Sequence, residues 1–587
     1  MNKPLKKLLI IALVSTLLYS CKEMKKDNNA AFDTFKGRFV EALWKTYPTW
    51  ANNLGYHKYD SVLVVPDTAS RKKEMKFNKD YEDSLHTFTI TDLNTDNQID
   101  YRMIENQIEY AKWGLTDLKQ FEWDPSLYNV GDAFALLLTE HYAPLDNRLR
   151  SFAHKLPLVT AYYQAARASI NKPAMEQTDL AIQQNSGLAD IFEKQLPDTL
   201  KKSGLSETEK QEILKNSALA VTAIKGYVDW LKNDVVKQIK AGQGRSFRIG
   251  KALYDKKFDF ELESHYTAEE IYQKALKRKD EVHAEMAKRA KELWPKYFGN
   301  TLMPDDRLVL IRKVLDTIAS EHANRDSFQA DIETLVPKII DFVNKKDLVF
   351  IDPKKPLVIR QTPDYKEGFS VASIDAPGPY DKYANTYYNV GSLKKYDAKG
   401  AESFLREYNK YTIQIISIHE AIPGHYVQLM HANQSPDIIK TIFSSGAMVE
   451  GWAVYTERMM MEEGYGDNDP ALWLMYYKWH LRAVCNTILD YGLQVNNMSE
   501  ADAMNLMEKE GFQEESEAEG KYRRATLSQA QLCYYFTGFS EIYDLREELK
   551  KKLGDKFSLK QFHEKFLSYG SAPVKYIREM MLADNNW

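Results

Sequence analysis

The stretch HEAIPGHY, residues 419 to 426, holds the side chains of this sequence that are best suited to chemistry. His419 and Glu420 begin it like an HExxH zinc-binding motif, but the second histidine, His425, follows after six residues instead of four. On a regular α-helix, residues six apart differ by about 120° in azimuth, so these histidines could not bind one ion. Pro423 lacks an N–H and crowds the preceding turn, whereas Gly424 tolerates unusual backbone angles. We therefore expect a π-like widening of the helix that turns His425 back toward His419.

A third ligand is available in the segment MVEGWAVYTERMM, residues 448 to 460. On a helix, Glu450 and Glu457 share nearly the same azimuth but lie about 10 Å apart along the axis, so at most one of them binds the ion. The other would contact a ligand. Two histidines and one carboxylate leave the fourth position on zinc open for water, which is the arrangement of a catalytic site. Glu420 would then take the proton of that water as a general base, with one Zn²⁺ per chain.

The elements that must position these residues are mostly helices. Apolar side chains from residue 404 onward recur every three or four positions and predict one amphipathic helix that carries His419. Ser206 with Glu209, and Thr267 with Glu270, form predicted capping boxes in front of long helical runs at about 207–241 and 268–292. The remaining helix-like stretches are 33–56, 98–114, 148–173, 304–345 and most of 400–581. The fold class is therefore mainly α.

Residues 347 to 398 are the exception, because they contain five prolines separated by β-rich runs at 348–351, 357–362 and 385–390. We expect a small antiparallel sheet in front of the zinc helix. A division near residue 346 gives an N-terminal helical lobe, 31–346, and a C-terminal lobe, 347–587.

The N-terminus predicts export. Lys3, Lys6 and Lys7 precede an apolar run at 8–19 that is too short to span a bilayer but suits a signal peptide, residues 1–20. Cys21 follows at the place of the acylated cysteine of a bacterial lipoprotein, with a polar tether at 21–30. We expect a membrane-anchored lipoprotein on the periplasmic face or the cell surface; the alternative is an ordinary signal peptide with an incidental cysteine.

Composition excludes several other classes. The 587 residues are 44% hydrophobic and 28% charged, as in a folded globular protein. The formal net charge of −4 gives no reason to expect a nucleic-acid partner. Cys485 and Cys533 lie in apolar, helix-like contexts and are expected to be buried free thiols.

The two motifs resemble a bacterial family known as domain of unknown function 885, with the pattern HE-x-x-PGH-x-x-Q followed by EGWA-x-Y-x-E. Further segments that are similar to the family occur at 47–57, 376–381, 387–391 and 562–574, so the resemblance covers the mature chain. The family is thought to belong with the gluzincins, which are mainly helical, two-lobed zinc peptidases of the neurolysin kind.

This resemblance implies residue roles that spacing alone leaves open. It selects Glu450, 25 residues after His425, as the third zinc ligand and leaves Glu457 in contact with a ligand. It implies that the strand containing Tyr388 holds an extended peptide, and that Tyr535 stabilises the oxyanion. Family positions near the substrate match at Arg524 and Gln531. The chain departs from the pattern at Gln494, Ala525, Gln529 and Ala530, where the family has His, Tyr, Pro and Gly.

Other polar residues have two interpretations. Gln428 either orients a ligand or is a solvated amide, and Arg524 binds either a substrate carboxylate or a buried glutamate. His431, His480 and His563 have no partner at ligand spacing, so we expect structural roles. The sequence favours a zinc peptidase that cuts short peptides in a cleft between the lobes. Its rivals are a non-catalytic glycan- or peptide-binding lipoprotein and a zinc hydrolase of other amides or esters.

Overall fold

The computed structural model describes residues 28–362, 372–376, 378–380, 385–394, 396–433, 437–585 and 587. Within them the chain is mainly helical with a small sheet, as the sequence predicts. The predicted signal peptide and Cys21 lie outside the described residues. None of the helices in the described ranges is long and apolar enough to cross a membrane.

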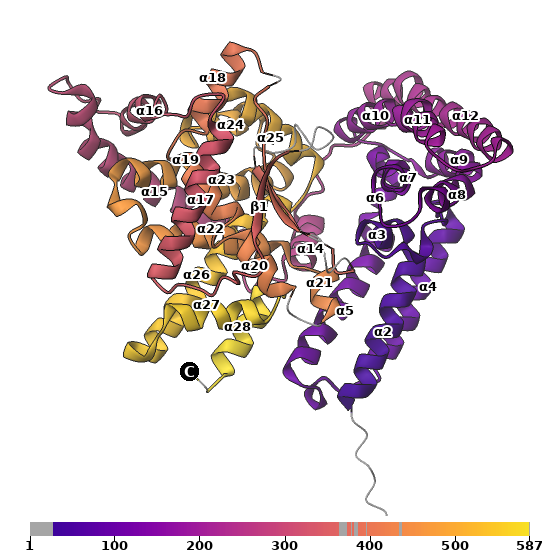
Figure 1. Ribbon diagram of the computed structural model, residues 1–587, viewed down its shortest axis with the longest axis horizontal. Coiled ribbons are helices and arrows are strands. Elements are labelled where there is room, and N and C mark those ends of the chain that lie inside the picture. The colour runs from indigo at the N-terminus through magenta and orange to yellow at the C-terminus, as the bar shows by residue number, and fades with distance from the viewer. Residues whose placement is uncertain are drawn as a thin grey trace, which may run out of the picture.

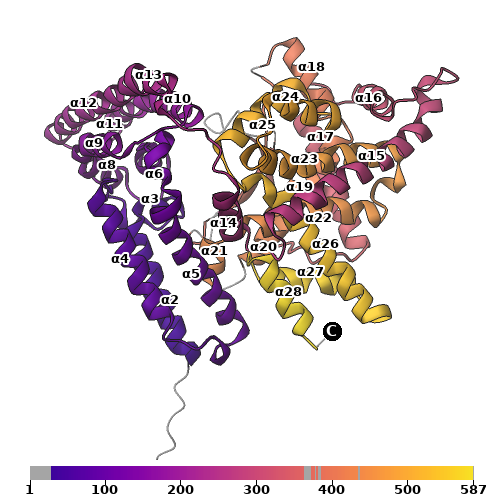
Figure 2. The ribbon, with the colours of Figure 1, turned by 180° about the vertical axis from the view of Figure 1, so that it is seen from behind.

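Two helical bodies lie side by side (Figures 1 and 2). We call residues 28–243 the N-terminal body and residues 251–587 the C-terminal body. The helices of the N-terminal body are α2 (Asn28–Thr46), α3 (Pro48–Asn53), α4 (Thr68–Leu85), α5 (Thr95–Trp113), α6 (Gln120–Trp123), α7 (Gly131–Thr139), α8 (Leu145–Lys155), α9 (Val159–Ser169), α10 (Met175–Asp190), α11 (Leu196–Lys201), α12 (Glu207–Trp230) and α13 (Val236–Gln238).

The C-terminal body contains the remaining helices and the sheet. Its helices before the sheet are α14 (Lys251–Leu262), α15 (Ala268–Phe298), α16 (Arg307–Ile318) and α17 (Phe328–Lys345). Those after the sheet are α18 (Ala398–Glu407), α19 (Thr412–Glu420), α20 (His425–Ala432), α21 (Ile438–Ile442), α22 (Gly446–Glu462), α23 (Pro470–Gln494), α24 (Glu500–Asn505), α25 (Glu515–Leu527), α26 (Tyr534–Leu553), α27 (Leu559–Ser568) and α28 (Val574–Ala583).

Both predicted capping boxes are confirmed at the helix starts. The Ser206 hydroxyl accepts a hydrogen bond from the Glu209 backbone N–H at the start of α12, and the Glu209 carboxylate accepts one from the Ser206 N–H. Thr267 and Glu270 make the same reciprocal pair at α15. Each pair satisfies two backbone N–H groups that the helix itself leaves free.

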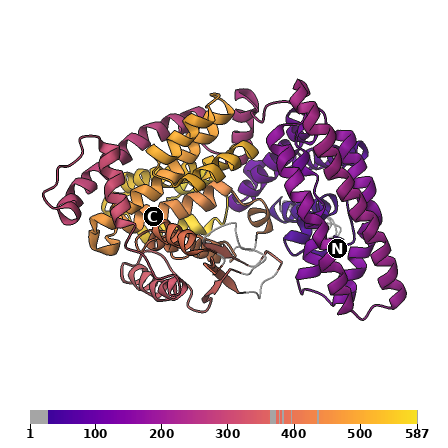
Figure 3. The ribbon, with the colours of Figure 1, turned by 90° about the horizontal axis from the view of Figure 1, so that it is seen from above.

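We expected an antiparallel sheet, but the sheet is mixed. Its strands are β1 (Leu357–Gln361), β2 (Ala372–Asp375) and β3 (Thr386–Val390), in the order β1-β3-β2, with β3 parallel to β1 and antiparallel to β2. The predicted run at 348–351 forms no strand, because Leu348 and Val349 are buried among helices and the Leu348 carbonyl accepts a hydrogen bond from His563. The sheet lies at the side of the C-terminal body that faces the N-terminal helices (Figures 1 and 3).

Buried apolar side chains form two clusters. One lies within the N-terminal body and runs from Leu63 to Val235. The larger one joins the inner N-terminal helices to the whole C-terminal body, α14 to α17 included. The division that we expected near residue 346 therefore falls between elements that share one core. Cys485 and Cys533, both within this larger core, are buried free thiols as predicted.

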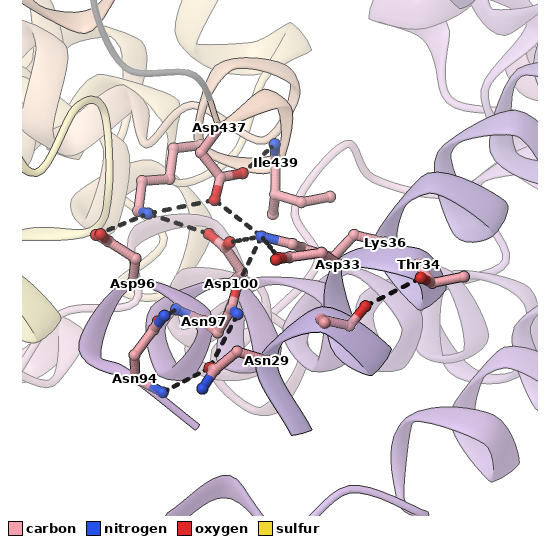
Figure 4. Close-up of polar contacts among 12 residues, drawn as sticks. Asn29, Asp33, Thr34, Lys36, Asn94, Asp96, Asn97, Asp100, Asp437 and Ile439 are labelled. Carbon is pink, nitrogen blue, oxygen red and sulfur yellow. Dashed lines mark hydrogen bonds and ion pairs between the residues drawn. The ribbon is translucent and has the colours of Figure 1, made fainter. Parts of the chain in front are cut away.

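A cluster of charges also joins the two bodies (Figure 4). The Lys36 ammonium, on α2, lies 2.7 Å from a carboxylate oxygen of Asp100 on α5 and 3.1 Å from one of Asp437, just before α21. Lys440 of α21 lies 3.3 Å from the other Asp100 oxygen. Asp100 is fully buried, so its charge depends on these two lysines.

Candidate metal centre and its pocket

The helix that carries His419 is shorter than the periodicity predicts. The expected single helix from residue 404 is interrupted between α18 and α19, at residues 408–411. The buried Asn409 side chain accepts hydrogen bonds from the backbone N–H groups of Tyr411, at 3.0 Å, and Thr412, at 3.2 Å. These bonds start a new helix, because they satisfy N–H groups that would otherwise need a preceding turn.

The widening expected at Pro423 is larger than a bulge inside one helix. Helix α19 ends at Glu420 and α20 begins at His425. Between them, the Ile422 N–H reaches back to the Ser417 carbonyl at 3.1 Å, and the Gly424 N–H reaches the Ile418 carbonyl at 3.0 Å. These spacings of five and six residues replace the four-residue spacing of an α-helix. The junction therefore places His425 at the first turn of a new helix.

This junction brings the two histidines together with Glu450 of α22. The Nε2 atoms of His419 and His425 lie 3.7 Å and 3.5 Å from Glu450 Oε2, and the three ligand atoms all lie within 4.8 Å of one another. The imidazole rings are perpendicular, with centroids 4.8 Å apart. The two histidines, six residues apart in sequence, thus aim at one point.

Glu457 holds the first histidine from behind. Glu457 lies two helical turns beyond Glu450 on α22. Its carboxylate lies 2.6 Å from His419 Nδ1 and accepts a hydrogen bond from Trp479 Nε1 at 3.2 Å. A hydrogen bond at Nδ1 leaves Nε2 of His419 directed at Glu450 as the free donor atom. This is the contact of a carboxylate that orients a ligating histidine. The buried Nδ1 atom of His425, by contrast, has no hydrogen-bond partner in the described part of the chain.

The donor set fits a tetrahedral divalent cation. Two ligand atoms bound about 2.0–2.1 Å from such an ion stand about 3.4 Å apart, close to the two separations that meet at Glu450. Burial raises the pKa of Glu450, but the adjacent imidazoles of His419 and His425 outweigh burial and hold that pKa well below its ordinary value. Glu420 and Glu457 add two more carboxylates around the same rings. Carboxylates attract divalent cations in general, whereas imidazole ligands suit transition metals such as Zn²⁺ better than Mg²⁺ or Ca²⁺.

Glycines set the distance from this centre to Tyr535. A Cβ on Gly538 of α26 would lie 1.8 Å from the Ala447 carbonyl, and one on Gly451 of α22 would lie 2.3 Å from the Gly538 carbonyl carbon. Only glycine at both positions allows the two helices to approach this closely. Tyr535, one turn before Gly538, therefore comes to the Glu450 side of the pocket. Burial and the charge of Glu450 raise the pKa of Tyr535 to about 12, so its hydroxyl remains a donor at neutral pH.

The centre opens into a cavity of about 1080 Å³. His419, His425, Glu420, Glu450 and Tyr535 all line it. All the described residues that line it fall between Thr362 and Tyr535 in the sequence, so the N-terminal body contributes none of the described wall. The expected cleft between two lobes is therefore a pocket within the C-terminal body.

Three further predicted residues lie outside the inner shell of this centre. Gln428 is fully buried and its amide donates to Ser571 Oγ at 2.9 Å, so it ties α20 to the segment before α28 and touches no ligand. Arg524 is exposed at the pocket wall and donates to Gln531 Oε1 at 2.6 Å. Gln531 therefore holds Arg524 in place and does not itself line the pocket.

Gln494 and Tyr388 were expected to contact substrate, and burial rules this out. Gln494 is 1% exposed and bonds the backbone of Ile249 and Ala525. Tyr388 is fully buried on the central strand β3, with its hydroxyl 3.2 Å from Ser417 Oγ. A central strand also has no free edge for a peptide, which corrects the role expected for residues 385–390.

The departures from the family pattern share this buried region. Gln529 is 1% exposed and accepts a hydrogen bond from Lys257 at 3.0 Å, and Ala525 is fully buried against Gln494. Ala530 has φ of 66°, a left-handed conformation that the family's glycine would adopt without strain. None of these four residues is among those that line the pocket. The four departures therefore lie in the packing behind α25, outside the residues that line the pocket.

The remaining histidines have structural contacts. His431 bonds the Phe350 carbonyl at 3.1 Å, and His480 is fully buried beside Arg278. His563 is fully buried between the Leu348 carbonyl and the Tyr455 hydroxyl, each at 2.8 Å. Burial lowers the pKa of His563 to about 4, so its ring is neutral.

Several pocket residues were not identified from the sequence. Trp479, Arg482 and Asn486 line it from α23, and Lys521 lines it from α25. The available signal was a polar stripe at spacings of three and four residues within the otherwise apolar α23. Helical periodicity shows such a stripe but does not show which neighbour it faces.

Comparison with known proteins supports a single family unit. A solved structure from Shewanella oneidensis, provisionally named a lipoprotein of unknown function, is 50% identical over 94% of this chain and 99% of its own, with a TM-score of 0.89. A lipoprotein structure from Colwellia psychrerythraea, also provisionally named, is 16% identical over 94% and 98%, with a TM-score of 0.73, and shows the same fold. No curated protein matches. The model of the family described as "Bacterial protein of unknown function (DUF885)" matches residues 48–581, and the chain therefore belongs to this family.

Proposed function

We propose that the protein is a zinc-dependent hydrolase, a metallopeptidase of the gluzincin kind that cuts short peptides. The observation that carries this proposal is the convergence of His419, His425 and Glu450 at separations of 3.5 and 3.7 Å in the wall of a large pocket. A structural zinc site would be closed by four protein ligands, whereas three ligands beside a cavity leave a position for the reaction.

The surrounding side chains have the chemistry that hydrolysis needs. Zn²⁺ bound by the three ligands would supply Lewis-acid polarisation of the scissile carbonyl. Glu420 follows His419 directly and lines the pocket, so its carboxylate would take a proton from the attacking water and pass it to the leaving amine. The Tyr535 hydroxyl would donate a hydrogen bond to the oxyanion of the tetrahedral intermediate.

The sheet offers a place for the peptide backbone. Of the described strands, β2 pairs only with β3, and Ala372, Ser373 and Ile374 of β2 line the pocket. An extended peptide that adds to an exposed strand edge gains backbone hydrogen bonds without sequence preference. We therefore assign to β2 the role that the resemblance had suggested for the strand at 385–390.

We further propose that the protein is exported and held at the membrane by lipid on Cys21. The Shewanella oneidensis structure, 50% identical, bears a provisional lipoprotein name, and the sequence around Cys21 has the matching features. A short peptide in the periplasm or at the cell surface would reach the pocket directly. Labelled palmitate incorporated into the wild type and lost in Cys21→Ala tests this part.

Substitution of Glu420 by Gln tests the hydrolase. The variant should lose peptide hydrolysis by at least about 10³-fold while its zinc content stays near one per chain, because Gln keeps the shape of Glu but accepts no proton. The matched control, Glu333→Gln on the exposed face of α17, should keep full activity. The activity is read from a mixed-peptide digest by mass spectrometry, with esters and non-peptide amides assayed in parallel. Wild-type rates in Glu420→Gln would refute the mechanism.

A further inference from the structure

One wall of the pocket is built from two facing helices. Helix α23 contributes Trp479, Arg482, Ala483 and Asn486, and helix α25 contributes Glu517, Gly520, Lys521 and Arg524. Each set follows the spacing i, i+3, i+4, i+7, so each is one continuous helix face. This wall carries the lysine and arginine side chains that line the pocket, together with Glu517, whereas the other described carboxylates of the pocket, Glu420, Glu450 and Glu457, surround the metal centre.

Arg482 and its neighbours are already balanced in charge. Arg482 pairs with Glu517 and lies 3.3 Å from Glu407, which also pairs with Lys478 at 2.7 Å. These four residues therefore contribute two positive and two negative charges. Their charges cancel, and Arg482 and Glu517 are themselves part of the pocket wall.

Lys521 and Arg524 are left without such compensation. No carboxylate in the described part of the chain lies within ion-pair distance of either, and no described group makes a hydrogen bond to the Lys521 ammonium. Within the described part of the chain, the side chain of Arg524 makes its hydrogen bond to the neutral side chain of Gln531. Burial lowers the pKa of Lys521 well below its ordinary value, and the positive charges of Arg482 and Arg524 lower it further. An ammonium that is taken out of water at Lys521 without a counter-charge destabilises the folded protein unless an anion binds there.

Lys521 and Arg524 line the same pocket as the residues of the proposed reaction. Arg524 and Tyr535 line the same pocket, and the charges of Arg524, Glu420 and Glu450 all act on the pKa of Tyr535. Asn486, 7% exposed, also lines the wall, and its Oδ1 atom has no partner among the described residues. An anion held by Lys521 and Arg524 would therefore lie in the same pocket as the reacting bond.

We propose that Lys521 and Arg524 form a subsite for a substrate carboxylate, so that the preferred substrates are short peptides with a free carboxylate close to the cleaved bond. This inference rests on the proposed peptidase function. In a peptide the anionic groups are carboxylates, and a lysine point charge beside an arginine fork is a suitable pair for one. The carboxylate belongs either to the peptide C-terminus or to an acidic side chain.

Binding measured without turnover tests the subsite. The protein as isolated, in the Glu420→Gln background, is titrated by calorimetry with an acetylated tripeptide acid, its C-terminal amide, and an amide that contains glutamate. The acid should bind at least about 10-fold more tightly than the plain amide, as expected for a charge-assisted pair. In Lys521→Met this ratio should fall to about one. The control Arg523→Met, on the exposed side of α25, should keep it.

The third peptide identifies the source of the carboxylate. Tight binding of the glutamate-containing amide would assign the subsite to a side chain, and weak binding would assign it to the C-terminus. Lys521→Arg should restore part of the preference. Because Lys521 has no ion-pair or hydrogen-bond partner among the described residues, Lys521→Met should also raise the urea midpoint of unfolding, whereas loss of a structural lysine would lower it.

Failure of the subsite and failure of the peptidase are distinguishable. The subsite is overturned, even if peptides are hydrolysed, by either of two results. One is equal affinity for the acid and the amide when Lys521 is intact, and the other is a lowered urea midpoint in Lys521→Met. Preferential binding of the acid by a protein that hydrolyses no peptide retains the subsite and refutes the peptidase. Arg524→Gln, compared with Arg523→Gln, repeats the test if Lys521→Met does not fold.

Discussion

At the scale of single residues, the two histidines of the centre are held differently. His419 is fixed by the Glu457 carboxylate at 2.6 Å, which in turn accepts from Trp479. His425 has no such partner in the described ranges and is placed by the backbone at the start of α20. A negative charge at Nδ1 makes Nε2 more basic, so His419 should be the stronger ligand.

Glu457→Gln removes this charge and keeps the volume of the side chain. We expect the affinity for Zn²⁺ to fall by about 10- to 100-fold, because a neutral amide supports the basicity of His419 less than a carboxylate does. Competition with a chromophoric chelator measures it. The control Glu463→Gln, just beyond the end of α22, should leave the affinity unchanged. Equal affinities in the two variants would show that Glu457 has a packing role only.

The sequence predicted the ligand types but not every contact. Spacing left Glu450 and Glu457 as alternatives, and the structure places the first among the ligand atoms and the second behind His419. Gln494 and Tyr388 could not be assigned correctly, because their burial depends on helices and strands far away in sequence. Lys521 was missed for the same reason, since its face of α25 is defined only by α23 opposite.

At the scale of elements, the centre depends on backbone approaches that only glycine permits. The α19–α20 junction requires the Gly424 N–H to reach the Ile418 carbonyl, and the crossing of α22 with α26 requires Gly451 and Gly538. The Pro-Gly pair predicted a distortion here. Its size was not predictable, because it is fixed by α22, whose Trp452 Nε1 donates to the Pro423 carbonyl at 2.9 Å.

Gly424→Ala tests the junction. A Cβ at this position would lie 1.8 Å from the His419 carbonyl oxygen and 2.4 Å from that of Ile418, so the backbone that aims both histidines must move. We expect a loss of about 3 kcal/mol or more in the free energy of unfolding, together with loss of bound zinc. Urea denaturation and elemental analysis measure the two effects.

Gly187→Ala is the matched control for this change. Gly187 is exposed within α10, and a Cβ there would meet nothing within 4 Å. Alanine should stabilise that helix by up to about 1 kcal/mol and leave zinc content unchanged. Normal zinc binding by Gly424→Ala would show that the junction has another route to the same geometry.

Periodicity predicted where helices occur better than where they break. The apolar repeat from residue 404 continues through the break at 408–411, because Tyr408 and Tyr411 still face the core on either side of Asn409. The break itself follows from the Asn409 side chain, which competes with the helix for backbone N–H groups. The strand β2 was missed because four residues carry too little alternation to be distinguished from a loop.

At the scale of the whole molecule, the chain holds its two bodies together through one continuous core and one buried charge cluster. Phe443, just after α21, contacts Phe39 and Trp50 of the N-terminal body, with ring centroids 6.1 and 5.9 Å apart. Beside it, Lys36 bridges Asp100 and Asp437. Residues 437–443, which include α21, are therefore anchored on the N-terminal helices, and this connects the region of the metal centre to the rest of the fold.

Lys36→Met should loosen this anchor. It removes one of the two cations that compensate the fully buried Asp100, so we expect the free energy of unfolding to fall by about 3 kcal/mol, the lower end of the range for a broken buried pair. The same change at the exposed Lys45 of α2 should stay within about 0.5 kcal/mol. Combining Lys36→Met with Asp437→Asn in a double-mutant cycle isolates the link between the bodies. Additive effects in that cycle would mean that the cluster stabilises the N-terminal helices alone and does not couple them to the segment after α20.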